Sequence, residues 1–349
     1  MANAAETRVI APNFKRRLSG VTSTIVQLVP EQNRQGQHVA VLGPGLPDHL
    51  PHLDWVDLLK LWQRPAGGGK RIWHARRNNE MLFGLLLRDI LRMPVRLLFT
   101  SAAQRNHSRY TRWLISRMDA VVATSARSGS FLKVPHTVVS HGVDLDLFHP
   151  PASPGEMMAA TGLPGRYLVG CCGRVRHSKG TDLFVRAMIE LLPQYPDWTA
   201  VITGRVTAEH KAFATALEAD IKAAGLQDRI RFLGEVDDVK PWFRRLTLYV
   251  APSRNEGFGL TPLEAMASRT TVVASDAGAY AGMIVPGKTG EIAPAGDFDT
   301  LRNAIARYLA DPAMAEAHGE AALAEVRARF DLRGEAAALG AIYKRLSSL

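Results

Sequence analysis

The sequence of 349 residues has only two cysteines, and they are adjacent, Cys171 and Cys172. Neighbouring residues on a strand point to opposite faces, which argues against a disulfide between them. The sequence also has no group of carboxylates and histidines with the spacing of a metal site. We therefore expect two small buried thiols in a reducing compartment, no metal, and no tightly bound cofactor.

Long apolar runs are missing as well. No run approaches the ~20 residues that a membrane-spanning helix needs, and residues 1–8 have no apolar core of the kind found in a signal peptide. These features predict a cytoplasmic protein. The run from Met81 to Leu87 is followed by Arg88 and Asp89. It is interpreted either as an ordinary helix packed on a sheet or as a segment at a membrane interface.

Two nucleotide-binding motifs are missing too. The sequence has no G-x-x-x-x-G-K-[ST] loop, so phosphoryl transfer from ATP is not supported. It has no G-x-G-x-x-G after its first predicted strand, which weighs against a nicotinamide enzyme.

Positive charge is present in excess and is unevenly distributed. The net charge is +10, and residues 1–150 carry all of it, with 20 Lys and Arg against 10 Asp and Glu. This basic half would attract a polyanion such as an anionic lipid, a phosphorylated glycan or a nucleic acid, or it is a solvated surface without a specific partner. No motif that reads DNA or RNA accompanies it, so we expect no nucleic-acid partner.

Apolar runs alternate with helical segments along the whole chain, which predicts an α/β protein with parallel sheets. The predicted strands are 8–11, 38–42, 71–74, 95–100, 120–124 and 137–140, then 167–172, 198–203, 230–233, 246–251 and 271–274. A proline-rich stretch, 143–154, separates the two series. We expect two Rossmann-like domains, 1–150 and 151–334, that face a central cleft, followed by a C-terminal helix over 335–349.

Two carboxylates flank a glycine-bearing loop in the stretch from Arg254 to Ser268. Glu256 precedes the loop, and Glu264 lies in the helix that Thr261-Pro-Leu-Glu264 begins, with Thr261 as the expected N-cap. A helix N-terminus after a strand and a glycine loop binds anions, while carboxylates accept hydrogen bonds from hydroxyl groups. Together they indicate a ligand with phosphate and sugar hydroxyls. Taken singly, Glu264 could be a capping residue and Glu256 an ordinary loop carboxylate.

A basic loop follows another predicted strand. Gly173-Arg-Val-Arg-His-Ser-Lys-Gly180 lies between strand 167–172 and a helix, and it carries Arg174 and Lys179. Breaking a sugar–diphosphate bond develops negative charge on the leaving phosphate, which two cations placed there would stabilise.

These two motifs resemble the retaining glycosyltransferases of family 4, which have the GT-B fold. The resemblance implies that the C-terminal helix over 335–349 packs back on the N-terminal domain. The resemblance implies that Arg174 and Lys179 bind the donor diphosphate and act in catalysis. It also implies that Glu256 binds the transferred sugar as a catalytic residue, and that Glu264 binds the ribose. The donor-binding residues would include the loop between the glutamates, Gly257, Phe258, Gly259, Leu260 and Thr261.

The N-terminal half departs from this family in two places. The loop after the first strand usually has two glycines at the donor phosphate, whereas only Gly20 is present here, beside Lys15, Arg16 and Arg17. The histidine that many members carry after a central strand is missing at Ser101–Gln104. The basic loop residues, with His74, Arg76 and His107, are our candidates for acceptor binding.

Stretches 11–24, 73–80 and 204–210 resemble the α-proteobacterial lipopolysaccharide core mannosyltransferases. This implies GDP-mannose as donor, a Kdo-containing lipid A precursor as acceptor, and peripheral contact with the cytoplasmic face of the inner membrane. One alternative is a transferase that uses a UDP- or ADP-hexose on another anionic glycan or lipid. A second is a non-catalytic protein that binds sugar nucleotides or nucleic acid.

Overall fold

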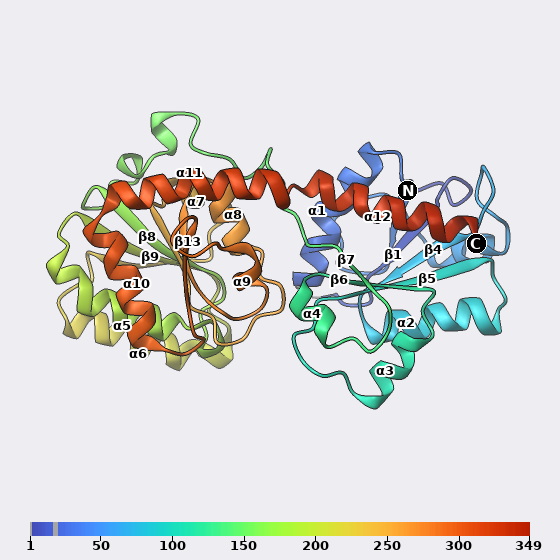
Figure 1. The fold of residues 1–349 in the computed structure, drawn as a ribbon, viewed down its shortest axis with the longest axis horizontal. Helices are drawn as coiled ribbons and strands as arrows, with labels where there is room; N and C mark the ends of the chain where they lie inside the picture. The colour runs from blue at the N-terminus through green and yellow to red at the C-terminus, as the bar shows by residue number, and fades with distance from the viewer. Residues whose placement is uncertain (1, 17–19) are drawn as a thin grey trace. The chain divides into compact units, whose positions relative to one another are not determined.

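The computed structural model describes residues 2–16 and 20–349 and divides into two compact units (Figure 1). Unit 1 comprises Met1–Gly142 and Leu332–Leu349, and unit 2 comprises Val143–Asp331. The division thus falls after Gly142 rather than after residue 150, and after Asp331 rather than after residue 334. The proline-rich stretch 143–154 belongs to unit 2 and is not a separate linker.

The sheet of unit 1 has seven parallel strands in the order β3-β2-β1-β4-β5-β6-β7. Six of them correspond to predicted strands, and β3 (His52–Leu53) was not predicted. The central strands are apolar and buried on both faces, as parallel strands covered by helices require. The six strands are β1 (Val9–Pro12), β2 (Val39–Leu42), β4 (Arg71–Ala75), β5 (Val95–Ser101), β6 (Ala120–Ala123) and β7 (Thr137–Val138).

Helices cover both faces of this sheet. Alternate strand residues pack on one side against α1 (Gly20–Arg34) and the C-terminal helix α12 (Leu332–Ser348). The other side packs against the 3-10 helix η1 (Trp55–Trp62), α2 (Asn78–Leu85) and α3 (Arg109–Ser116). Helix α2 continues as a π-helical turn, η2 (Leu86–Ile90), and the short α4 (Ala126–Ser130) follows β6.

Unit 2 contains a six-stranded parallel sheet in the order β10-β9-β8-β11-β12-β13. Five strands were predicted, and the sixth, β13 (Gly290–Ala293), was not. The five are β8 (Tyr167–Cys172), β9 (Trp198–Thr203), β10 (Ile230–Gly234), β11 (Leu248–Ala251) and β12 (Thr271–Ser275).

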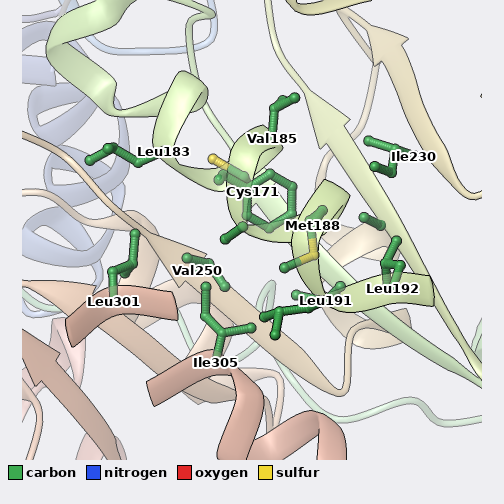
Figure 2. Packing of buried hydrophobic residues seen from close by; sticks show 14 of the residues in the cluster. Cys171, Leu183, Val185, Met188, Leu191, Leu192, Ile230, Val250, Leu301 and Ile305 are labelled. Carbon is green, nitrogen blue, oxygen red and sulfur yellow. The ribbon is translucent and has the colours of Figure 1, made fainter. Parts of the chain in front are cut away.

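Two hydrophobic clusters flank the unit 2 sheet. The cluster in Figure 2 packs β8, β9 and β11 against α5 (Thr181–Leu191), α6 (Lys211–Ala223) and α10 (Phe298–Ala310). On the opposite face lie α7 (Lys240–Arg245), α8 (Thr261–Ala267), α9 (Tyr280–Met283) and α11 (Pro312–Arg329). The 3-10 turns of this unit are η3 (Pro154–Glu156), η4 (Met158–Thr161), η5 (His177–Lys179), η6 (Leu192–Gln194) and η7 (Ala208–His210).

Each sheet reverses its strand order once, between β1 and β4 in unit 1 and between β8 and β11 in unit 2. In open α/β sheets, ligands bind beyond the carboxyl ends of the strands at such switch points. The loops after these four strands are therefore where a site is expected. Among the described residues, no helix is both long enough and apolar enough to cross a membrane.

Candidate functional site

The two loops that the sequence singled out meet at the switch point of unit 2. Residues 173–180 follow β8, and residues 252–260 follow its neighbour β11. Gly180 permits their close approach, because a Cβ atom there would lie 1.9 Å from the carbonyl oxygen of Pro252. Its φ of +70° is also one that residues with side chains rarely adopt.

Polar contacts fasten these loops to each other. Arg254 donates two parallel hydrogen bonds, each 2.7 Å long, to the carboxylate of Asp182 in the first turn of α5. Its backbone N–H also donates to the carbonyl oxygen of Ser178 over 3.0 Å. Bidentate arginine–carboxylate pairs hold a fixed geometry. The contacts of Arg254 with Asp182 and Ser178 therefore fix the two loops against each other.

Lys179 and Glu256 form an ion pair between the loops, through Nζ and Oε2. The hydroxyl group of Tyr280 donates to the same carboxylate oxygen over 3.2 Å. Both members of the ion pair are mostly but not fully buried, with 23% and 16% of their side-chain surfaces exposed. Lysine has three N–H donors, and a carboxylate has room for several, so both can also bind a ligand.

Arg174 lies beside this pair. It lines one small cavity together with Lys179, Thr261 and Tyr280. The structure thus brings the two predicted cations and the first predicted carboxylate to one place, at the carboxyl ends of adjacent strands. Their roles toward a donor remain predictions.

Glu264 lies one turn into α8. The helix begins at Thr261 with Leu260 as N-cap, so the prediction that Thr261 is the N-cap is wrong by one residue. Burial raises the pKa of the Glu264 carboxyl to about 7, while the charge of Lys240 acts against this rise. A carboxyl that titrates near neutral pH is unusual for a capping residue and common in ligand sites.

The loop between the glutamates has a backbone that requires glycine. Gly259 has a φ of +84°, and a Cβ atom there would lie 2.3 Å from the Tyr280 ring and 2.8 Å from Cγ of Glu256. Phe258 is buried in the core of unit 2, whereas Gly257 is exposed and Leu260 is half-buried. The glycine therefore allows the loop to close around the Glu256 side chain.

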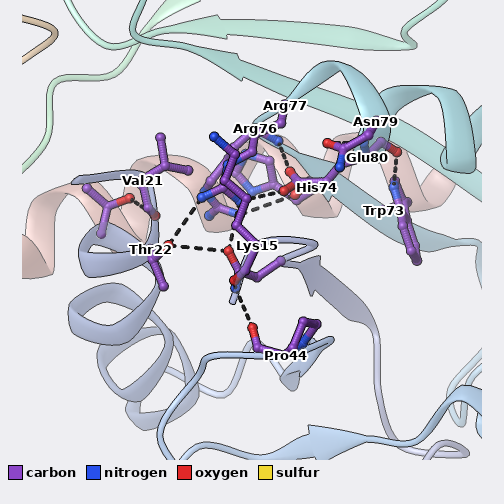
Figure 3. A network of polar contacts seen from close by, with 12 residues as sticks. Lys15, Val21, Thr22, Pro44, Trp73, His74, Arg76, Arg77, Asn79 and Glu80 are labelled. Carbon is purple, nitrogen blue, oxygen red and sulfur yellow. Dashed lines mark hydrogen bonds and ion pairs between the residues drawn. The ribbon is translucent and has the colours of Figure 1, made fainter. Parts of the chain in front are cut away.

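A second polar network occupies the switch point of unit 1 (Figure 3). The buried Asn13, directly after β1, donates to the carbonyl oxygens of Lys15 and Pro44. It accepts a 2.8 Å hydrogen bond from Arg77, which also pairs with the fully buried Glu80 over 2.6 Å. This network joins the loops after β1, β2 and β4.

The predicted acceptor residues of unit 1 do not share one environment. Lys15 and Arg16 are exposed, Gly20 is the exposed first residue of α1, and Arg17 lies outside the described residues. His107 is half-buried, 3.5 Å from the hydroxyl group of Ser101, and burial followed by the charge of Arg105 lowers its pKa.

His74 is buried, and both ring nitrogens are occupied. They lie 2.7 Å from the hydroxyl groups of Tyr343 and Thr100. Burial, followed by the charge of Arg76, holds its pKa well below the ordinary value. We therefore interpret His74 as a neutral residue that holds α12 on the sheet. Arg76, which is half-buried, donates to the carbonyl oxygen of His74 over 3.2 Å.

Across residues 2–16 and 20–349, no three His, Cys, Asp or Glu side chains are grouped so that they could hold a metal ion. Cys171 and Cys172 are both free thiols, and burial raises the pKa of Cys172 to about 12.

Two Rossmann-like units with parallel sheets, each with a switch point, are the architecture of the GT-B class of glycosyltransferases. A sucrose-phosphate synthase from Thermosynechococcus elongatus has the same fold, with a TM-score of 0.79 and 23% identity over 98% of this chain and 99% of its own. The family model described as glycosyl transferases group 1 matches residues 156–324.

The chain belongs to the family of lipopolysaccharide core biosynthesis mannosyltransferases. It is 69% identical to the member LpcC of Rhizobium leguminosarum bv. viciae, over 99% of this chain and 98% of the relative. It is 51% identical to LpsB of Rhizobium meliloti (strain 1021), over 99% of both chains. These relatives confirm the predicted family and show that the chain is an enzyme.

Sequence reasoning missed several residues at these sites. Arg254 opens the stretch that contains the two glutamates, but no role was predicted for it. Asp182 and Tyr280 lie outside both motifs, although Asp182 follows the basic loop by only two positions. Asn13 and Arg77 lie inside stretches that were noted only for their resemblance. Their positions within three residues of the ends of predicted strands could have indicated the network.

Proposed function

We propose that this enzyme transfers mannose from GDP-mannose to the Kdo-containing inner core of a lipid A precursor, with retention of anomeric configuration. The names of the two full-length relatives, both lipopolysaccharide core biosynthesis mannosyltransferases, support the sugar and the acceptor class. The observation that carries the donor chemistry is the Lys179–Glu256 pair at the switch point of unit 2.

In this proposal, Arg174 and Lys179 bind the diphosphate. The bond between the anomeric carbon and the diphosphate oxygen breaks, and negative charge develops on that oxygen. The acceptor hydroxyl forms the new bond to carbon on the same face of the sugar, and its proton passes to the departing phosphate oxygen. GDP and the mannosylated acceptor are the products, and no protein nucleophile takes part.

The carboxylates have separate roles. Glu256 accepts hydrogen bonds from mannose hydroxyls, and its ion pair with Lys179 holds the carboxylate in position. Glu264 accepts hydrogen bonds from the ribose diol. The negative charge that develops on the leaving diphosphate is stabilised by Arg174 and Lys179. We therefore propose that no tightly bound metal or other cofactor is required.

The acceptor is an anion, since it carries phosphates and sugar carboxylates, and we propose that the basic unit 1 binds it. Lys15 and Arg16 are exposed and follow β1, one of the two strands at the switch point of that unit. His107 is a further candidate, because its lowered pKa leaves the imidazole neutral at neutral pH and able to accept a hydrogen bond from an acceptor hydroxyl group.

The test incubates the purified protein with GDP-mannose and a Kdo-lipid A acceptor. One added hexose by mass spectrometry is the expected result, and the anomeric configuration of the product by NMR tests retention. Product with UDP-glucose or an ADP-hexose, but not with GDP-mannose, would contradict the donor assignment.

A pair of lysine variants tests the site. Lys179→Ala removes a cation from the leaving diphosphate and should lower kcat by about 10²–10³-fold, as removal of one preorganised charge-stabilising donor does. Lys288→Ala is the control, because Lys288 is an exposed lysine in the same unit. Equal activity of the two variants would contradict the role of Lys179.

A further inference from the structure

Exposed apolar side chains gather on one layer of unit 1. Among the described residues, fourteen large hydrophobic side chains are exposed, and ten of them come from η1, from α2 with its continuation η2 and Leu91, and from α3. Isolated exposed apolar residues are ordinary, but a contiguous set marks an interaction surface. The outward side of these elements is called the apolar face below.

Helical periodicity places exposed apolar residues on the outward side of each of these elements. On η1, Trp55, Val56, Leu59 and Trp62 are exposed, whereas Leu58 and Leu61 are buried in the core. The helix therefore has two apolar sides, and only one of them serves the fold. A helix that packs on a sheet is expected to turn polar residues to solvent, so the second apolar side needs another explanation.

The next element shows the same feature. Leu82, Leu86 and Ile90 are spaced by four residues and form one exposed stripe along α2 and η2, with Ile90 exposed to 72%. This stripe is joined to η1, because Nε1 of Trp62 donates to the carbonyl oxygen of Leu91 over 2.8 Å.

Helix α3 completes the surface. Trp113 lines an apolar groove with Leu82, Leu86 and Ile90. Tyr110 stacks on Trp113, with ring centroids 6.3 Å apart. Three neighbouring elements thus present one continuous apolar face.

Positive charge borders this face on one side. The segment 105–118, which includes α3, carries Arg105, Arg109, Arg112 and Arg117 and has no Asp or Glu. Arg117 lies over the Trp113 ring, 5.8 Å from its centroid. An arginine beside exposed aromatic rings can bury its aliphatic stem against apolar groups while its guanidinium group stays at a polar interface.

We propose that the apolar face inserts shallowly into a membrane surface that contains anionic lipid. Trp55, Trp62, Tyr110 and Trp113 are suited to the region between headgroups and acyl chains, and the aliphatic residues to the acyl chains below it. The arginines of α3 then meet lipid phosphates. This goes beyond the proposed transfer reaction, because it rests on the surface of unit 1 and requires no particular donor.

Charge favours a membrane over a second copy of the chain as the occupant. In a twofold dimer the same patch meets itself. The arginines of 105–117 would then be pressed against a copy of the same face, whose exposed large side chains are apolar. The carboxylate in its groove, that of Asp89, is already paired with Arg88, and burying charges without partners is costly. An anionic membrane satisfies both the apolar side chains and the arginines.

Flotation with vesicles tests the proposal without any sugar donor, so its outcome is independent of the transferase assay. The protein is mixed with vesicles of phosphatidylcholine alone or with phosphatidylglycerol added. We expect stronger binding to the anionic vesicles, and Leu59→Glu and Ile90→Glu should each weaken it by about tenfold or more, since each removes an inserted side chain. Both sites are well exposed, so the fold is retained.

Leu349→Glu is the matched control, because Leu349 is exposed to 67%, as Leu59 is, and lies outside the apolar face. Arg112→Gln should weaken binding to anionic vesicles only, while Arg327→Gln, an exposed arginine of unit 2, should have no effect. The proposal is overturned if the unchanged protein binds neither kind of vesicle, or if Leu349→Glu weakens binding as much as Ile90→Glu. It is also overturned if light scattering shows a dimer that Ile90→Glu dissociates while vesicle binding is unaffected.

Discussion

Glu256 and Glu264 are two carboxylates in one motif, but their surroundings differ. Glu256 forms an ion pair with Lys179 and accepts a hydrogen bond from Tyr280, so groups on two other elements hold its carboxylate. Glu264 is held in α8 where burial raises its pKa to about 7. This contrast comes from packing that the motif itself does not encode.

The raised pKa of Glu264 predicts that donor binding depends on pH. A carboxylate accepts hydrogen bonds from both hydroxyls of a ribose, which the protonated acid does less well. With a pKa of about 7, about a tenth of the molecules have an ionised Glu264 at pH 6 and about nine tenths at pH 8. The affinity for GDP-mannose, measured by calorimetry, should therefore rise about ninefold between these two values. The sugar diphosphate is suited to this test because it is a diester with no titration near pH 7.

The raised pKa of Glu264 also predicts how the stability of the ligand-free protein depends on pH. Between pH 4.5 and about 7 the folded protein binds this proton more tightly than the unfolded chain, so the free energy of unfolding falls as pH rises through this window. Glu264→Gln should be free of this term, and its melting temperature should exceed that of the unchanged protein by more at pH 8 than at pH 5. An equal difference at both values would contradict the assigned pKa.

At the scale of single residues, the sequence predicted Arg174, Lys179, Glu256 and Glu264 because they lie inside short motifs next to recognisable strands. Tyr280 could not be predicted in this way. It reaches Glu256 only because α9 follows β12, the strand beside β11, and sheet order is not written in any local pattern. Arg17, predicted as an acceptor residue, lies outside the described residues.

Small residues determine how helices pack in this protein as much as large residues do. The buried face of α11 is built from Ala315, Gly319, Ala322 and Val326 together with Leu323. A Cβ atom at Gly319 would lie 2.4 Å from the carbonyl oxygen of Arg269, so glycine lets this helix lie against the backbone before β12. No helix was predicted between residues 310 and 334, because a helix face built from such small residues shows little contrast in hydrophobicity along the sequence.

The prediction of strands from the sequence has a similar limit. Those with apolar runs of four or more residues were predicted to within two residues of their ends, whereas β13 has the sequence Gly-Glu-Ile-Ala and contains a charged residue. It is a strand because β12 pairs with it from Val272 to Ser275 and α10 covers it, which are tertiary causes. β3 has only two residues, too few for any pattern.

The loop between β11 and α8 gives a prediction at the scale of elements, through its glycine Gly259. Gly259→Ala places a methyl group against Tyr280 and Glu256 in a backbone conformation that costs alanine about 1–2 kcal/mol. The loop should shift, and donor affinity and kcat should both fall by about tenfold or more, because catalytic geometry tolerates little displacement. Gly282→Ala in α9 is the control, since nothing lies within 4 Å of its added Cβ and its φ is not positive. Unchanged kinetics in Gly259→Ala, with the fold intact, would contradict the role of this loop.

At the scale of the whole molecule, the chain passes from unit 1 to unit 2 after Gly142 and returns after Asp331. Hydrogen bonds join the two passages on either side. In unit 2 the N–H of Val143 donates to the carbonyl oxygen of Phe330 over 2.8 Å. In unit 1 the carboxylate of Glu335 accepts from the N–H of Gly142 and lies 2.8 Å from Nδ1 of His141. The first unit is therefore completed only by the last helix of the chain.

This dependence predicts what truncation does. Helix α12 buries Leu332, Leu339, Ile342 and Leu346 against the sheet and α1. At about 1.5–3 kcal/mol for each buried aliphatic side chain, their loss costs about 6–12 kcal/mol, which is as large as the whole stability of a typical domain. A chain that ends at Asp331 should therefore keep a folded unit 2, whose contacts lie within 143–331, while unit 1 unfolds. Scanning calorimetry should show the transition of unit 2 alone, and hydrogen exchange should show that β1, β4 and β5 have lost protection. Removing only Leu349, which is exposed to 67%, should leave both units folded and provides the matched control. If the shorter chain retained protection in β1 and β4, the sheet and α1 would be stable without α12, and the last helix would be an accessory to unit 1 rather than a part of its core.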